Sequence, residues 1–361
     1  MKEETPYLNH INYFRGIAIV FIVFGHCFNV GFSHYYQNST PLAIFLQNLI
    51  PGGTTFFVFI SGYLFHHIYY KNFNLRDFLI KKLKYVIVPF LFISSIDIFY
   101  YLSRYIIAII LSSTKSEIYL AILKSHSSFN TYLIGHGEMT IGLWYIPFIT
   151  IIFSLSTVFI KYVKIKPNIQ LIIINILLIF SILIHRNGTN SILGIFQNVI
   201  YFTPVYLLGI SMSINFKKIY EKLKGKEIFI LLITLSIAII QTRIVVVDLI
   251  LSNNLKIENF DLMIIQKILF SIFFILFLFR YDYKKIKILN LLAENSFGIF
   301  FIHGICIWIF NVIVLKLKIS FETSSFLIYL LISSLILTFS LSITILIRKQ
   351  LPMMSKYIIG C

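Results

Sequence analysis

Arg15 and His26 interrupt an otherwise apolar stretch near the start of the chain and are separated by ten residues. Eleven helical steps of about 100° return to within roughly 20° of the starting direction, so both side chains lie on one helix face. At about 1.5 Å per residue they stand roughly 16 Å apart along the axis, about half of a hydrocarbon core. Ionisable groups at that depth are costly unless they face a cavity or a partner. A cation and an imidazole on one face suit a long anionic molecule that reaches into a membrane.

The composition is that of a membrane protein. Hydrophobic residues make up 58% of the 361 residues and charged residues 12%. Apolar runs of about 17–28 residues alternate with short basic loops, which predicts an all-α, polytopic transmembrane bundle. We expect one integral membrane domain over residues 1–361, without an appended soluble domain. The net charge of +17 is spread over many loops, which fits contact with membrane lipid and argues against nucleic acid.

We expect about ten membrane-spanning helices. Their approximate ranges are 11–31, 44–70, 85–112, 141–160, 168–185, 194–214, 227–247, 263–280, 289–315 and 324–347. Most basic residues lie at the N-terminus and in alternate loops, so the positive-inside rule predicts cytoplasmic termini. The expected location is a bacterial inner or plasma membrane, with Arg15 at the cytoplasmic surface and His26 in the outer half of the first span.

A basic cluster follows the second expected span. It contains Arg76, Lys81, Lys82 and Lys84. Cations beside a span contact anionic lipid, but they are equally suited to a phosphate group. The residues themselves leave both interpretations open.

Several other spans carry polar or small residues that could line a cavity. Ser61 and Gly62 permit a close helix approach, and Trp144 lies where an interfacial aromatic belt would also explain it. Ser296 and His303 lie seven residues apart on one face of the ninth span. Two histidines in spans far apart in the sequence, His26 and His303, indicate a shared polar cavity.

The third span contains Asp97 and Arg104, seven residues apart. Their axial separation of about 10 Å argues against a direct pair, so we expect buried partners on other helices. The three cysteines show no paired spacing, and no phosphate-binding glycine loop or metal-binding spacing is present.

Together these elements resemble the acyltransferase-3 family of integral membrane O-acyltransferases. The resemblance covers nearly the whole chain and follows the family's order. Besides Arg15 and His26, it is carried by Phe-Phe-x-x-x-Ser-Gly-Tyr (Phe56 to Tyr63), the basic cluster leading to Pro89, Leu-Trp-Tyr (Leu143 to Tyr145) and Ser-x-x-x-Phe-x-x-His (Ser296 to His303).

The resemblance implies transfer of an acyl group, which we expect to be acetyl, from cytoplasmic acyl-CoA to a hydroxyl of a surface or lipid-linked carbohydrate of the cell envelope. It also implies that His26 is the catalytic histidine and Arg15 its basic partner. Acyl-CoA would be a co-substrate, with no permanently bound cofactor and no metal. The chain departs from the family at Tyr85, where an arginine is frequent, and at Phe300, where a tyrosine is common.

We expect the CoA phosphates to lie among Arg15 and the basic cluster, and His26 to act as general base on the acceptor hydroxyl. A transient acyl-imidazole is the less favoured variant. Ser61, Trp144, Ser296 and His303 are candidates for the cavity or the oxyanion site. The alternative is a lipid-linked glycan flippase or polysaccharide exporter that uses the same cavity without chemistry. A transporter should show repeat symmetry, which the sequence lacks.

Overall fold

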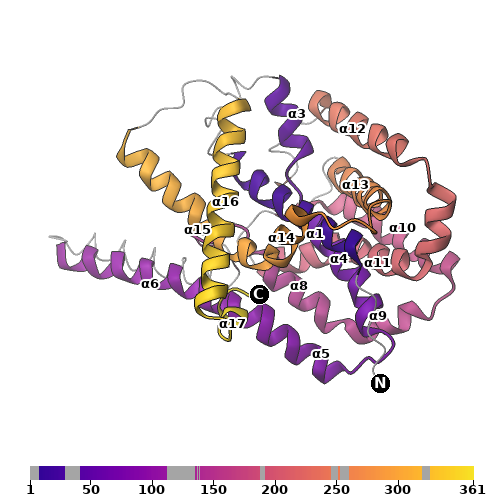
Figure 1. Cartoon of the computed structure of the whole chain (residues 1–361), viewed down its shortest axis with the longest axis horizontal. Coiled ribbons are helices and arrows are strands. Elements are labelled where there is room, and N and C mark those ends of the chain that lie inside the picture. Colours follow the sequence, from indigo (N-terminus) through magenta and orange to yellow (C-terminus); the bar gives the residue numbers. More distant parts are fainter. Residues whose placement is uncertain are drawn as a thin grey trace.

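The structure is a computed structural model, and it describes residues 8–28, 41–111, 135, 137, 139–187, 192–244, 251–252, 260–318 and 326–361. Helices form nearly all of the regular structure in these residues (Figure 1). The strands β1 (Arg186–Asn187) and β2 (Leu251–Ser252) have two residues each and pair in parallel. The all-α prediction is confirmed.

The α-helices, and the π-helical turns η2 and η3, are α1 (Asn9–His26), α3 (Pro41–Leu49), α4 (Thr54–Leu64), η2 (Phe65–Tyr69), α5 (Leu75–Lys82), η3 (Leu83–Ile87), α6 (Val88–Leu111), α8 (Tyr145–Ser154), α9 (Ser156–Val163), α10 (Pro167–Ile184), α11 (Ile192–Leu223), α12 (Glu227–Ile244), α13 (Leu262–Phe279), α14 (Lys287–Glu294), α15 (Ser296–Lys316), α16 (Phe326–Gln350) and α17 (Ser355–Ile358).

Seven helices in the described part of the chain are long and apolar enough to cross a membrane. The count rises to eight if α8 and α9, bent by 58° at their junction, form one broken span. Neither α1 nor α12 is among these helices. A multi-pass membrane protein is therefore supported, while the count of about ten spans and the cytoplasmic termini stay predictions.

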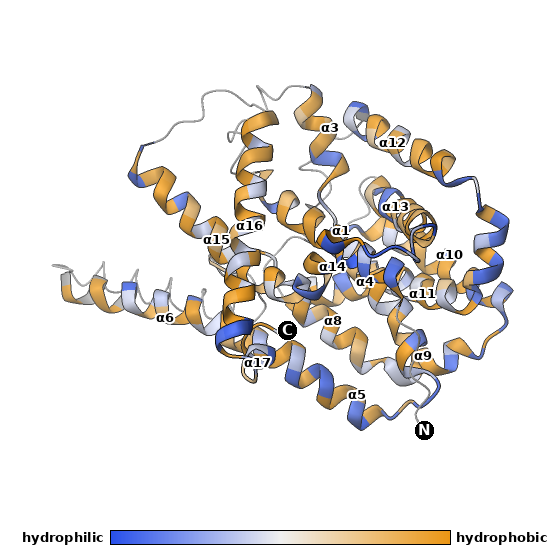
Figure 2. Ribbon diagram, in the orientation of Figure 1, coloured by the Kyte–Doolittle hydropathy of each residue, from blue (hydrophilic) through white to orange (hydrophobic). Residues whose placement is uncertain are grey.

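The outer helices present apolar side chains away from the bundle. On α16, Leu327, Leu331 and Leu335 follow one another at four-residue intervals and are 60–69% exposed. Figure 2 shows that hydrophobic residues predominate along α10, α12 and α16. Such stripes are unfavourable in water but are the expected surface of a helix in contact with lipid tails.

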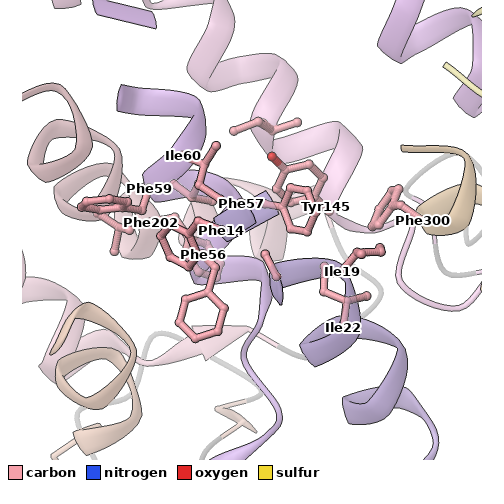
Figure 3. Packing of buried hydrophobic residues seen from close by; sticks show 14 of the residues in the cluster. Phe14, Ile19, Ile22, Phe56, Phe57, Phe59, Ile60, Tyr145, Phe202 and Phe300 are labelled. Carbon is pink, nitrogen blue, oxygen red and sulfur yellow. The ribbon is translucent and has the colours of Figure 1, made fainter. Parts of the chain in front are cut away.

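Helix α1 lies near the middle of the bundle, close to α4, α14 and α15 (Figure 1). Tyr13, Phe14, Ile19 and Val23 on this helix are fully buried. Phe14 packs on Phe56 of α4 with ring centroids 5.6 Å apart, within the cluster drawn in Figure 3. Because α1 is enclosed, its polar side chains must find their partners inside the protein.

Helices α4 and α11 pack closely against each other where each contributes a glycine. A methyl group on Gly62 would overlap the carbonyl oxygen of Tyr206, and one on Gly209 would overlap that of Phe59. The absence of a side chain lets the two backbones touch. This confirms the close helix approach predicted from Ser61 and Gly62. It also fixes the position of the α4 segment that carries Ser61.

Candidate active site

Two histidines from separate helices face each other in the interior. The rings of His26, at the end of α1, and His303, on α15, have centroids 5.3 Å apart and an interplanar angle of 39°. His303 is fully buried, while His26 is half-buried. The fold thus brings together the two imidazoles for which the sequence indicated a shared site.

The tautomer of His303 follows from its contacts. Its Nδ1 lies 2.7 Å from the carbonyl oxygen of Phe300 and 3.2 Å from that of Ile299. A carbonyl oxygen only accepts, so Nδ1 carries the proton and donates it. Nε2 then holds a lone pair, and this buried atom has no hydrogen-bond partner among the described residues. His303 therefore presents an acceptor nitrogen toward His26.

Gly142 closes the histidine pair from a third side. A Cβ atom at this position would lie 3.0 Å from Nε2 of His26 and 3.5 Å from Nε2 of His303. The residue also has a φ of 93°, which favours glycine. Both Nε2 atoms thus face one small space beside Gly142. Sequence reasoning missed this residue; its position directly before Leu-Trp-Tyr was the available signal.

Arg15 lies at the other level of α1. Its Nη2 donates to the carbonyl oxygen of Ala293 at 3.0 Å and to Oγ of Ser296 at 3.2 Å. Ser296 is the first residue of α15, and His303 lies two turns further along. Helices α1 and α15 consequently meet at two polar levels, Arg15 with Ser296 and His26 with His303.

A cavity of about 160 Å³ lies beside Arg15. Most of its lining residues are apolar, and those with a charged or polar group are Arg15, Ser61, Tyr69, Lys82, Tyr145 and Tyr206. The π-helical turns η2 and η3 both contribute to its wall. Such turns widen a helix locally and are frequent at functional sites. The described residues contain no group of three or more His, Cys, Asp or Glu side chains that could hold a metal ion.

Only one residue of the basic cluster lines this cavity. The ammonium group of Lys82 lies over the rings of Phe153, Phe78 and Tyr69, at 4.4, 5.2 and 5.5 Å from their centroids. Exposed positions are instead occupied by Arg76, Lys81 and Lys84. The structure therefore separates four cations that the sequence could only treat together.

A chain of ring contacts connects the cavity to the histidines. The ring of Tyr145, which lines the cavity, packs on Phe300 at 5.6 Å, and Phe300 lies 6.0 Å from the ring of His303. Figure 3 shows Tyr145 and Phe300 within the buried apolar cluster. Phe300 has no hydroxyl group, so this contact is apolar on its side.

Trp144 contacts neither the cavity nor the basic cluster. Its ring stacks on Phe148 at 5.6 Å, and the guanidinium of Arg186 lies 5.5 Å from its centroid. The sequence prediction placed Trp144 in a cavity or in an aromatic belt; the structure pairs it with a cation. Arg186 had no motif around it that could have identified it.

Comparison with known proteins places the chain in a family. The model of the acyltransferase-3 family, described as an acyltransferase domain, matches residues 8–345. No curated protein and no solved structure matches the chain. The matched range contains Arg15, Lys82, both facing histidines and Gly142. The chain therefore belongs to the acyltransferase-3 family and is a multi-pass membrane acyltransferase.

Proposed function

We propose that this enzyme transfers an acetyl group from acetyl-CoA to a hydroxyl of a surface or lipid-linked carbohydrate of the bacterial cell envelope. The observation that carries the proposal is the division of α1 into two polar centres. A cation-lined cavity lies at Arg15, and His26, eleven residues further along the same helix, faces the imidazole of His303 on α15.

The cavity supports an anionic, elongated donor. Arg15 and Lys82 offer positive charge to phosphate groups, while its mostly apolar walls suit an uncharged arm. At about 160 Å³ the cavity takes the narrow arm of a CoA ester rather than the whole molecule. We assign the exposed Arg76, Lys81 and Lys84 to anionic lipid head groups, not to the donor.

His26 is the proposed general base because it is the more accessible of the two imidazoles. It takes the proton of the acceptor hydroxyl as the hydroxyl oxygen bonds to the thioester carbonyl carbon. The carbon–sulfur bond then breaks, and the proton passes to the departing thiolate to give free CoA. Nε2 of His303 can accept a hydrogen bond from protonated His26. In its tautomer that nitrogen cannot donate to an oxyanion.

The test uses purified protein in proteoliposomes with radiolabelled acetyl-CoA and a lipid-linked glycan extract from the native host. We expect free CoA, detected with a thiol reagent, only when donor and glycan are both present, and an alkali-labile label on the glycan. Propionyl-CoA and palmitoyl-CoA in parallel define the acyl group. Glycan translocation without CoA release would instead support the exporter alternative.

A further inference from the structure

Asp97 is a fully buried carboxylate on α6, a helix that exposes large apolar residues such as Phe99. Its Oδ1 accepts the backbone N–H of Met139 at 2.8 Å, and its Oδ2 accepts the hydroxyl of Thr140. We expected partners on other helices; these two partners lie instead in the segment that leads into α8. Arg104, seven residues further along α6, is exposed above the ring of Tyr100.

Helix α15 holds the same segment from the other side. A methyl group on Gly304, the residue after His303, would lie 2.7 Å from the backbone nitrogen of Ile141 and 3.1 Å from the carbonyl oxygen of Met139. At Gly137 a methyl group would overlap the Asp97 carboxylate. Residues 139–141 are therefore clamped between Asp97 and the backbone of α15.

This clamp determines where Gly142 lies. Thr140, bound by Asp97, is only two residues before Gly142, and the backbone between them has little freedom once both sides are packed. Gly142 in turn faces Nε2 of both histidines. A displacement of the segment by a fraction of an ångström would change the space that both nitrogens share.

We propose that Asp97 is a positioning residue of the acyl-transfer site: by binding Met139 and Thr140, it holds Gly142 where the acceptor hydroxyl can reach the histidine pair. The proposal rests on the proposed function. Asp97 does not touch the reacting atoms; it acts through the 139–142 segment. It should therefore govern the chemical step and leave the donor cavity at Arg15 unchanged.

Two substitutions at Asp97 test this role. Asp97→Ala should lower kcat by about 10²-fold, the loss expected from a small misplacement of reacting groups, with the acyl-CoA KM within about twofold of wild type. Asp97→Asn should stay within about fivefold of wild-type kcat, because its amide oxygen can accept the Met139 N–H and its amide nitrogen can donate to Thr140. Equal losses in both variants, or a raised KM at unchanged kcat, would overturn the proposal.

Ser94→Ala is the matched control. Ser94 lies three residues earlier on α6, is also buried, and its Oγ has no hydrogen-bond partner in the described part of the chain. We expect wild-type kinetics from this variant. If Asp97→Ala does not yield folded protein, Thr140→Val removes one of the two contacts with less disturbance. Its kcat should fall about tenfold at unchanged KM, and wild-type kcat would contradict the clamp.

A readout without turnover separates this proposal from the proposed function. Diethyl pyrocarbonate modifies accessible imidazoles, and the His26 peptide can be followed by mass spectrometry. Asp97→Ala should accelerate modification of His26 several-fold, whereas Asp97→Asn and Ser94→Ala should not. If wild-type protein released no CoA, the proposed function would fail while this measurement still tested the clamp. An unchanged modification rate in folded Asp97→Ala protein would refute the clamp alone.

Discussion

The two polar centres of α1, at Arg15 in its N-terminal half and at His26 at its C-terminal end, differ in how their polar groups are satisfied. At Arg15 the guanidinium already donates to Ala293 and Ser296, and a cavity lies beside it. At His26 the space is closed by Gly142, and the buried Nε2 of His303 has no partner among the described residues. A satisfied cation next to a cavity suits binding, whereas an unused acceptor nitrogen suits a transient proton. Substitutions at the two centres should therefore affect different kinetic constants.

The largest expected effect is at the histidine end. His26→Ala should reduce acyl transfer by about 10²–10⁴-fold, because general base catalysis is lost. Acyl-CoA binding, measured by equilibrium dialysis with labelled donor, should be unchanged, because the phosphate contacts lie at the other centre. The control is Cys27→Ala, whose side chain points about 100° away from the Arg15–His26 face. Near-wild-type transfer by His26→Ala would remove the distinction between the two centres.

Gly142→Ala tests the same end without removing an imidazole. The methyl group would lie 3.0 Å from Nε2 of His26 at a φ that L-residues rarely adopt, so we expect kcat to fall by about 10–10². Gly225→Ala is the control that distinguishes the steric contact with His26 from backbone strain. Gly225 also has a positive φ, of 86°, but nothing lies within 4 Å of its Cβ position. Steady-state kinetics of both variants, with thermal unfolding as a check, make the comparison. Equal effects of the two substitutions would point to strain alone.

The smallest expected effect concerns the donor cavity beside Arg15. Lys82→Gln should raise the acyl-CoA KM about tenfold at similar kcat, because one charge-assisted contact with phosphate is lost. Lys84→Gln should leave KM unchanged, since Lys84 is exposed and does not line the cavity. Donor titrations at constant acceptor measure both constants. A lower kcat in Lys82→Gln, with KM unaffected, would place Lys82 in the chemical step. It would contradict the assignment of donor binding to the cavity at Arg15 and of chemistry to His26.

Several features could be predicted because they depend on local geometry. The apolar runs required helices, and the periodicity of a helix placed Arg15 and His26 on one face of α1 without reference to any other element. The order of short motifs along the chain was sufficient for the family, which the match over residues 8–345 confirms. Composition likewise indicated a membrane protein, and the exposed leucines of α16 agree with it.

Contacts between segments far apart in the sequence could not be predicted in the same way. No spacing within the basic cluster distinguishes Lys82, whose ammonium lies over a group of aromatic rings, from Lys84 two residues later. The partners of Asp97 lie some forty residues ahead, and Trp144 meets Arg186 across the fold. These outcomes depend on how neighbouring helices pack and on the side each presents.

The sequence by itself thus determined three features of this protein: its membrane helices, the cation and imidazole on one helix face, and the family to which the motifs belong. Helical periodicity and hydrophobicity act within one segment, so they can be read from consecutive residues. Only the tertiary structure decided that His303 turns an acceptor nitrogen toward His26 and that Gly142 closes the space between them. That arrangement depends on where α1, α15 and the segment before α8 pack against one another, and the close contacts that fix their positions join residues more than a hundred positions apart.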